Sequence, residues 1–516
     1  MNHSGNNSKT NKKAKNKYTQ LAKNTMVFAI GNFGSKILVI LLTRLYSQNI
    51  NPADSSTKEL LEITANFLLP IFTFSMSEAI IRYGLDKKYK KAEVFTTAMC
   101  LNLLGLGLMF IIAPALKLIS FLDFIDGYTI LLLIYVCTSA LRSMCSQFVR
   151  AKGYVKLYSF DGILATLTLF IFNIIFISKL HWGVKGFMLS VILSDLCSAV
   201  FLFYIANLKK YFYIKYYNKK LATSMMKFAL PLIPTVVMWV ITGFSDRLFI
   251  RYMKSDIVTL GEEAAGIYGY ASKIPNLISM ISTIFFQAWN MSAITENNSK
   301  DRNRFYEKIY SAYESILFIA SGILIAGVKI ISPLFVSAKN FKEYGDVYIY
   351  TPILVIAVLF MCLDQFLSSI YTATKHTKNS FWTSFVASMA NIILNYFLIP
   401  IWGIQGASIA TFLSYYLCFW ARIIDARYYV PFKFNAFRSI VNTVALLIMC
   451  VLIVKAPSFY GFWTFILFLI VMFINYNALM LTAKKLLKKY RRNIFYANPS
   501  QQCNKRQYCP NSHYAW

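Results

Sequence analysis

Long apolar stretches separated by short polar connections repeat along almost the whole chain. A helix that crosses the roughly 30 Å hydrocarbon core of a bilayer needs about 20 mostly apolar residues. The period-2 alternation that is typical of membrane barrels is missing. The pattern therefore predicts an all-α integral membrane protein with 14 transmembrane helices, at residues 25–46, 60–81, 94–118, 128–149, 159–178, 186–206, 228–248, 265–292, 309–332, 348–372, 380–400, 405–421, 439–454 and 460–482.

Composition and charge agree with a membrane location. Hydrophobic residues make up 57% of the 516 residues, more than soluble domains carry. The net charge of +31 would suggest a nucleic-acid partner, but most of the 53 Lys and Arg residues fall in alternate connections and both tails. By the positive-inside rule both termini are cytoplasmic, and the basic excess reflects topology and attraction to anionic headgroups. We therefore expect no nucleic-acid partner. We also expect no cleavable signal peptide, because the first 24 residues are polar and lysine-rich.

The predicted spans and topology also assign the remaining basic residues to one side of the membrane or the other. Lys58 is among the few basic residues on the opposite, outer side, and Arg422 is counted with the cytoplasmic connection 422–438.

A faint internal repeat divides the first twelve stretches into two halves. Residues 182–186 (WGVKG) recur as residues 402–406 (WGIQG), where the glycines indicate a tight turn between the fifth and sixth stretch of each half. Halves of six helices insert the same way up and bind substrate between them. We therefore expect two pseudo-symmetric six-helix lobes around a central cavity: a basic cytoplasmic tail (1–24), the first lobe (25–206), a cytoplasmic linker (207–227), the second lobe (228–427), two additional helices (437–482) and a basic cytoplasmic tail (483–516).

Charged residues inside apolar stretches are the candidate functional positions. A charge near the bilayer centre costs roughly 2.5–3.5 kcal/mol, so it usually lines a water-filled cavity or finds a partner. Lys36 and Arg142 lie in the first half and Lys273 lies in the second. Together they predict a cavity with net positive charge, which suits an anionic ligand such as a diphosphate. The acids are candidates for salt bridges or for carrying a coupling proton or sodium ion: Glu78, Asp161, Asp195, Asp246 and Asp364. No metal-ligand cluster or phosphate-binding glycine loop is found, so no metal or other cofactor is expected.

Several short motifs in both halves carry a resemblance. They are residues 31–36 (GNFGSK), 79–83 (AIIRY), 227–234 (KFALPLIP), 245–247 (SDR), 266–275 (GIYGYASKIP), 286–290 (FQAWN), 391–395 (NIILN), 399–400 (IP) and 403–407 (GIQGA). Together they resemble the polysaccharide flippases of bacterial cell-surface assembly, of the O-antigen and capsule type. These belong to the multidrug/oligosaccharidyl-lipid/polysaccharide exporter superfamily. The likeness extends over about residues 25–425, with one departure at Arg44, where relatives commonly end the first span with Pro-Leu-Tyr.

The resemblance implies a transporter and not an enzyme. Such proteins flip an undecaprenyl-diphosphate-linked oligosaccharide across the bacterial plasma (inner) membrane by alternating access between two lobes. Coupling to a proton or sodium gradient, as in an antiporter, is implied, and so are partners among the other polysaccharide-assembly proteins. The cations that match the family are Lys36, Arg82, Arg247 and Lys273, to which the burial argument adds Arg142. Prolines that kink membrane helices are hinge candidates: Pro231, Pro234 and Pro275.

Other functions remain as alternatives. One alternative is a flippase for lipid-linked peptidoglycan precursors, which has 14 spans and a cationic cavity like those expected of a polysaccharide flippase. A multidrug or cation exporter of the same superfamily would need a cavity dominated by acids. A membrane polysaccharide polymerase would need a large external loop, but the longest outer connection is 249–264 and the four histidines are peripheral to the apolar stretches.

Overall fold

The regular structure of the chain is helical. The computed structural model describes residues 38–86, 88–116, 120–296, 302–337, 342–374, 377–476 and 480, and within these ranges every regular element is a helix. Lys36 and both predicted basic tails lie outside the described residues.

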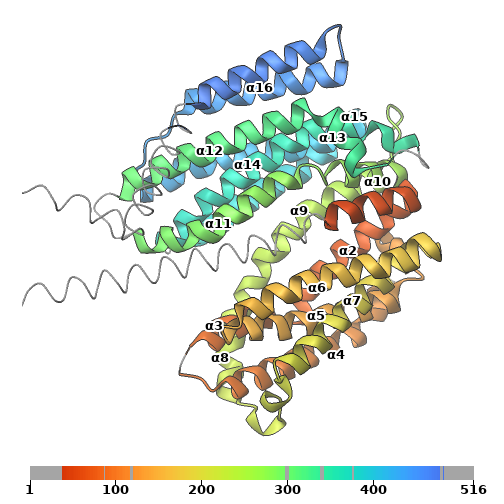
Figure 1. Cartoon of the computed structure of the whole chain (residues 1–516), viewed down its shortest axis with the longest axis vertical. Coiled ribbons are helices and arrows are strands. Elements are labelled where there is room, and N and C mark those ends of the chain that lie inside the picture. The colour runs from red at the N-terminus through yellow and green to blue at the C-terminus, as the bar shows by residue number, and fades with distance from the viewer. Residues whose placement is uncertain are drawn as a thin grey trace, which may run out of the picture. The chain divides into compact units, whose positions relative to one another are not determined.

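The helices follow one another along the chain with short connections (Figure 1). A helix at residues 38–49 is followed by α2 (Pro52–Phe72), α3 (Met76–Leu85), α4 (Lys91–Leu116), α5 (Thr129–Ala151), α6 (Val155–Asn173), α7 (Gly183–Ile205), α8 (Lys219–Ala229), α9 (Ile233–Tyr252), α10 (Glu262–Ala271), α11 (Asn276–Glu296), α12 (Arg302–Ala326), α13 (Val328–Phe335), α14 (Val347–Thr374), α15 (Thr377–Tyr429), α16 (Ala436–Lys455) and a helix at Tyr460–Tyr476. Shorter helical turns are η1 (Ser120–Ile125), the π-helical η2 (Ile174–Lys179), η3 (Leu208–Tyr211), η4 (Ile214–Tyr216), η5 (Leu230–Leu232) and η6 (Lys342–Asp346).

Length and apolar composition identify the membrane-spanning helices. Eight described helices are long and apolar enough to cross a membrane, or nine if α2 and α3, bent by 52° from each other, form one broken span. The chain is therefore a multi-pass membrane protein. The count of fourteen and the arrangement in two six-helix lobes remain predictions.

The second predicted span differs in form from the expected 60–81. The helix begins at Pro52, which suits the first helical turn because its missing N–H needs no partner there. Asn51 caps this end, and its side-chain oxygen accepts a hydrogen bond of 2.7 Å from the Asp54 backbone N–H. Lys58 and Glu59 therefore lie inside α2 and are buried, so the placement of Lys58 in an outer connection was wrong.

The repeated glycine motif has two structural features in common at its two occurrences. Gly183 (φ 52°) and Gly403 (φ 57°) both adopt the left-handed backbone that favours glycine. Gly186 and Gly406 follow three residues later, and each lies against the backbone carbonyl of the preceding helical segment, at Phe176 and Leu398 respectively. The repeat thus corresponds to a shared local structure.

The described helices form two compact units, residues 1–295 with 327–426 and residues 296–326 with 427–516. In the first unit, α5, α6 and α7 pack side by side with α4 against α5 (Figure 1), and α2 packs against α9 and α10. Gly266 of α10 lies so close to α2 that any Cβ would overlap the carbonyl of Pro52. In the second unit α12 packs against α16, and Arg438 forms a buried ion pair with Glu314. The candidate site lies entirely in the first unit.

Candidate functional site

The first unit contains an open cavity of about 530 Å³ with both polar and apolar lining. Its walls come from the helix at residues 38–49, from α2, α5, α6 and α7, and from α10 with the turn that follows it. Six charged side chains of the described residues line it: Lys58, Glu59, Glu62, Arg142, Asp195 and Lys273. Neutral hydrogen-bonding groups fill much of the remaining wall, among them Asn66, Ser139, Ser143, Ser146, Gln147 and Thr166.

Glu59 of α2 stands between two cations from later helices. Its Oε1 lies 2.7 Å from the Lys273 ammonium, and its Oε2 accepts a 3.0 Å hydrogen bond from Nε of Arg247. The Glu59 side chain is 7% exposed, so this carboxylate is almost withdrawn from solvent. A buried carboxylate needs such partners, because an unpaired buried charge is costly. The structure therefore brings together the two predicted cations Arg247 and Lys273 around an acid that the sequence analysis did not select.

Arg247 is held in place by further contacts. Its Nη1 donates a 2.8 Å hydrogen bond to the carbonyl of Gly243, and its guanidinium lies 5.5 Å from the ring centroid of Tyr268. Its Nη2 donates to Ser272, at 3.3 Å, in the break between α10 and α11. A guanidinium fixed on several sides presents its remaining donors in one orientation.

Lys58, one residue before Glu59, is an additional cation in the wall. Its ammonium lies 4.7 Å from the ring centroid of Tyr46 and 4.5 Å from that of Phe187, and 3.5 Å from the Glu62 carboxylate. Ring faces and a carboxylate together stabilise a desolvated ammonium. The signal in the sequence is the spacing of Lys58 and Glu62, an i,i+4 pair typical of a helix that already runs through these positions.

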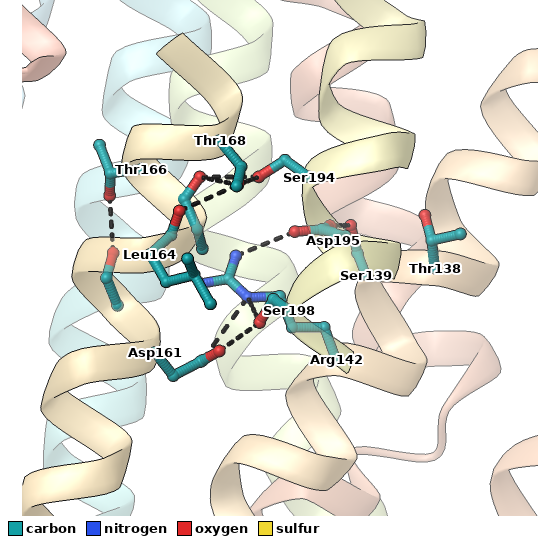
Figure 2. A network of polar contacts seen from close by, with 12 residues as sticks. Thr138, Ser139, Arg142, Asp161, Leu164, Thr166, Thr168, Ser194, Asp195 and Ser198 are labelled. Carbon is teal, nitrogen blue, oxygen red and sulfur yellow. Dashed lines mark hydrogen bonds and ion pairs between the residues drawn. The ribbon is translucent and has the colours of Figure 1, made fainter. Parts of the chain in front are cut away.

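Arg142 of α5 joins two acids from neighbouring helices (Figure 2). Its Nη1 lies 2.9 Å from Asp195 of α7, and its Nε lies 3.9 Å from Asp161 of α6. Ser198 links the group, because it accepts a 3.1 Å hydrogen bond from Arg142 Nε and donates to Asp161, while Ser139 donates to Asp195. The three predicted charged residues thus form one network, of which Arg142 and Asp195 line the cavity.

The charges around the cavity are balanced among the described residues. The cations Lys58, Arg142, Arg247 and Lys273 pair with the carboxylates Glu59, Glu62, Asp161 and Asp195. The sequence predicts a net positive cavity, and the difference comes from Glu59 and Glu62, which lie just outside and at the edge of the predicted span 60–81. Lys36, the remaining expected cation, lies outside the described residues.

The other predicted charged positions lie away from this cavity. Arg82 and Glu78 are exposed on α3, where the Arg82 guanidinium lies 5.9 Å from the ring centroid of Phe228. Arg44, the departure from the family pattern, donates a 2.8 Å hydrogen bond to the carbonyl of Pro333 at the end of α13.

Asp246 of α9 is the centre of a separate buried network. Its carboxylate accepts hydrogen bonds from Tyr268 (2.6 Å), Thr411 (2.8 Å) and Asn395 (2.6 Å), all neutral groups. Asn391 accepts from both Asn395 and Ser245. Among the residues that the structure describes, no Lys or Arg forms an ion pair with Asp246, and its hydrogen-bond donors are all neutral.

Asp364 of α14 is paired with Arg422 of α15, and both side chains are 1% exposed. Arg422 Nε lies 3.7 Å from the carboxylate and donates to Thr383, while its other nitrogens donate to Ser384 and to backbone carbonyls. The assignment of Arg422 to a cytoplasmic connection was wrong, because α15 continues to Tyr429 and buries it.

The three predicted hinge prolines lie at or beside breaks in the helices. Pro231 is in η5, the short turn between α8 and α9, and Pro234 is the second residue of α9. Pro275 is the last residue of the break between α10 and α11, which also contains Lys273. Their role as hinges remains a prediction.

Comparison with known proteins identifies the fold. The sequence matches no known family profile. It is 26% identical over 255 residues to an uncharacterized membrane protein of Methanocaldococcus jannaschii, a match that spans 47% of this chain and 58% of that relative.

Solved transporters resemble the structure over most of its length. The inward closed conformation of the lipid II flippase MurJ superposes with a TM-score of 0.65 at 16% identity, covering 90% of this chain and all of the flippase. An inward-facing multidrug resistance transporter of the MATE family gives 0.59 at 15% identity, over 78% of this chain and 95% of that one. The Vibrio cholerae MATE transporter VcmN in its bent form gives 0.51 at 12% identity, over 80% and 99%. The chain has the fold of these transporters of the MOP superfamily, the same superfamily as the one named from the sequence motifs.

Proposed function

We propose that the protein moves an undecaprenyl-diphosphate-linked oligosaccharide between the leaflets of the bacterial plasma membrane. The observation that carries this proposal is the carboxylate of Glu59, held by Arg247 and Lys273 at the wall of a cavity rich in neutral polar groups. A guanidinium N–H and a lysine ammonium that hold a carboxylate can also hold phosphate oxygens. Glu59 therefore occupies the position where the diphosphate of the substrate binds.

The rest of the cavity wall suits the sugar portion of such a substrate. Ser143, Ser146 and Gln147 follow one another along α5, and Asn66 faces the same cavity from α2. Hydroxyl and amide groups can both donate hydrogen bonds to sugar hydroxyls and accept hydrogen bonds from them. The ammonium and guanidinium groups would bind the diphosphate while these neutral groups bind the glycan.

Replacement of the Glu59 carboxylate by the substrate diphosphate, as the partner of Arg247 and Lys273, would couple substrate binding to alternating access. The two ion pairs of Glu59 connect α2 with α9 and with the break after α10. Neighbouring contacts connect the same elements: Arg251 of α9 donates to Ser56 and Thr57 of α2, at 3.2 and 3.1 Å. A diphosphate that takes the two cations from Glu59 removes the charged part of this connection, so substrate binding favours separation of α2 from α9 and α10.

Asp246 is the strongest candidate for the site of a coupling ion. It is a buried carboxylate surrounded by hydroxyl and amide groups, and no described cation forms an ion pair with it, so a proton or a sodium ion can supply the missing positive charge. We expect Asp246→Asn to flip substrate without responding to an imposed proton or sodium gradient, because an amide carries no titratable charge. The measurement is flipping rate in proteoliposomes with and without each gradient.

The matched control for this prediction is Asp425→Asn. Asp425 also accepts hydrogen bonds from an amide, Asn379, but lies near the end of α15. The control variant should keep the gradient response of the wild type. An unchanged gradient response in Asp246→Asn would show that coupling resides elsewhere.

The experiment that tests the proposed substrate uses the purified protein in liposomes. A short undecaprenyl-diphosphate oligosaccharide is placed in one leaflet, and its arrival in the opposite leaflet is followed. The proposal predicts flipping that exceeds that of protein-free liposomes. Absence of flipping, with expulsion of small organic cations instead, would assign the protein to drug export.

A lipid-linked peptidoglycan precursor is the second candidate substrate. The superposition on a lipid II flippase, which covers 90% of this chain, favours it over an organic cation. It carries the same diphosphate, so the site around Glu59 would bind both candidate substrates equally well. Selectivity between them must then come from contacts with the glycan. Faster flipping of the peptidoglycan precursor than of the oligosaccharide lipid would select this second candidate.

A further inference from the structure

A cluster of basic and aromatic side chains lies where α5 and α7 end, away from the cavity. We call it the basic–aromatic cluster, and it consists of Lys152, Tyr154, Lys210 and Tyr211. Lys152 directly follows α5, and Lys210 and Tyr211 belong to η3, just beyond α7. Both α5 and α7 are membrane-spanning by length and composition, so the cluster lies at the level of the membrane surface.

Two ammonium groups converge on one tyrosine in this cluster. The Lys152 ammonium lies 4.4 Å from the ring centroid of Tyr211 and 4.5 Å from that of Tyr154. The Lys210 ammonium lies 5.2 Å from the Tyr211 centroid. Burial acts to raise the pKa of the Tyr211 phenol, but hydrogen bonds and charge from Lys152 and Lys210 outweigh it and lower this pKa. The hydroxyl therefore experiences a strongly positive environment.

The positive charge of the cluster is not compensated within the described part of the chain. No carboxylate there forms an ion pair with Lys152, Lys210 or the adjacent Arg150. This differs from the cavity, where every described cation has a carboxylate partner. Like charges that converge without an anion repel each other, and an added anion between them relieves that repulsion.

The segment that carries Lys210 is firmly anchored. Leu208 is fully buried in the apolar core between α3, α4, α5 and α8, and the Tyr211 ring packs on Phe148 at 5.4 Å. The hydroxyl of Thr96 on α4 donates a 2.7 Å hydrogen bond to the Tyr211 carbonyl and accepts one from the Tyr213 N–H. The cluster is thus a preformed arrangement, so an anion that binds there does not have to order the segment first.

Apolar and aromatic residues beside the cluster are exposed. Tyr204 is 78% exposed, Ile205 62% and Ile214 81%, and Tyr154 and Tyr213 are also exposed. Tyrosines at the ends of membrane helices typically lie at headgroup level, and exposed isoleucines there contact acyl chains. A ligand that combines a phosphate with acyl chains satisfies both features, whereas a free phosphate satisfies only the charge.

We propose that the basic–aromatic cluster is a binding site for the phosphate of an anionic phospholipid headgroup. The phosphate lies between the Lys152 and Lys210 ammonium groups, and the acyl chains run along Tyr204 and Ile205 at the end of α7. This site fixes the connection that follows α7 to the membrane surface. It is independent of the cavity and of the proposed transport substrate.

The test measures lipid retained by the purified full-length protein in native mass spectrometry. Phosphatidylglycerol is the anionic probe, and phosphatidylcholine is the neutral comparator. We expect Lys152→Ala with Lys210→Ala to lower the affinity for phosphatidylglycerol about tenfold and to leave phosphatidylcholine binding unchanged. Lys152→Arg with Lys210→Arg should retain binding, because the charge is kept.

The matched control is Lys179→Ala with Lys185→Ala, which removes two exposed lysines where α6 and α7 meet, at the other end of α7. This control should bind phosphatidylglycerol as the wild type does. Equal loss in the control, or full retention in the Lys152 and Lys210 alanine variant, would overturn the proposal. Displacement of phosphatidylglycerol by millimolar inorganic phosphate would also overturn it, because the site would then select a free anion.

Discussion

Alanine at both Arg247 and Lys273 is expected to slow flipping of an undecaprenyl-diphosphate oligosaccharide about 100-fold in proteoliposomes. The reason is that hydrogen bonds to charged groups contribute about 1.5–3 kcal/mol each, and two such groups are lost. Each single alanine variant should slow flipping about tenfold. Membrane insertion should be unaffected, since the apolar faces of α9 and α10 are unchanged.

Two controls separate loss of binding from damage to the protein. Arg44→Ala removes a cation that donates to a backbone carbonyl and does not line the cavity, so it should flip normally. The triple variant Arg247→Ala, Lys273→Ala and Glu59→Gln leaves no unpaired carboxylate, and it should stay as slow as the double variant. Recovery of flipping in the triple variant would mean that the unpaired Glu59, and not the lost cations, caused the defect.

Arg142→Ala is expected to lower the free energy of unfolding by about 3 kcal/mol. Removal of the guanidinium leaves Asp161 and Asp195, which are 1% and 7% exposed, without the cation that compensates them (Figure 2). An uncompensated buried charge is among the costliest results of a single substitution. The measurement is equilibrium unfolding in mixed micelles, with loss of helical structure as the signal.

The control for Arg142 is Arg82→Ala, which removes an exposed arginine whose described contact is the Phe228 ring. Its effect should stay below about 1 kcal/mol. Adding Asp161→Asn and Asp195→Asn to Arg142→Ala should restore much of the stability, because the repelling carboxylates are gone. Equal stability of Arg142→Ala and Arg82→Ala would contradict the role of the network.

The sequence predicts most of the helices because hydropathy is a local property. The apolar stretches at 128–149 and 186–206, for example, correspond closely to α5 and α7. Prediction from hydropathy fails where a helix carries charged residues. Lys58 and Glu59 lower the hydropathy at the start of α2, and Arg422 does so near the end of α15, so the predicted spans stop short of all three residues.

Pairing between distant charges could not be predicted from the sequence. Arg247 and Glu59 are 188 residues apart, and nothing local indicates that they meet. Arg142, Asp161 and Asp195 are each predicted as functional positions separately, since each is a charge within an apolar stretch. Only the packing of α5, α6 and α7 shows that they belong to one network, and that an acid accompanies each cation.

On the predicted division into two halves, ion pairs lie on corresponding helices with opposite polarity. In the first half the cation, Arg142, is on α5 and the acids are on α6 and α7. In the second half the acid, Asp364, is on α14 and the cation, Arg422, is on the part of α15 that follows Gly403. A sequence comparison that requires identical residues misses this relation, because the charges are exchanged.

Substrate affinity of Glu59→Gln against the wild type tests the central claim most directly. If the diphosphate takes the place of the Glu59 carboxylate between Arg247 and Lys273, removal of that internal competitor frees both cations. The account predicts that the purified variant binds an undecaprenyl-diphosphate oligosaccharide about tenfold more tightly than the wild type. Weaker or unchanged binding by a folded Glu59→Gln variant would contradict the account, because the Glu59 ion pairs would then be structural and the diphosphate would bind elsewhere.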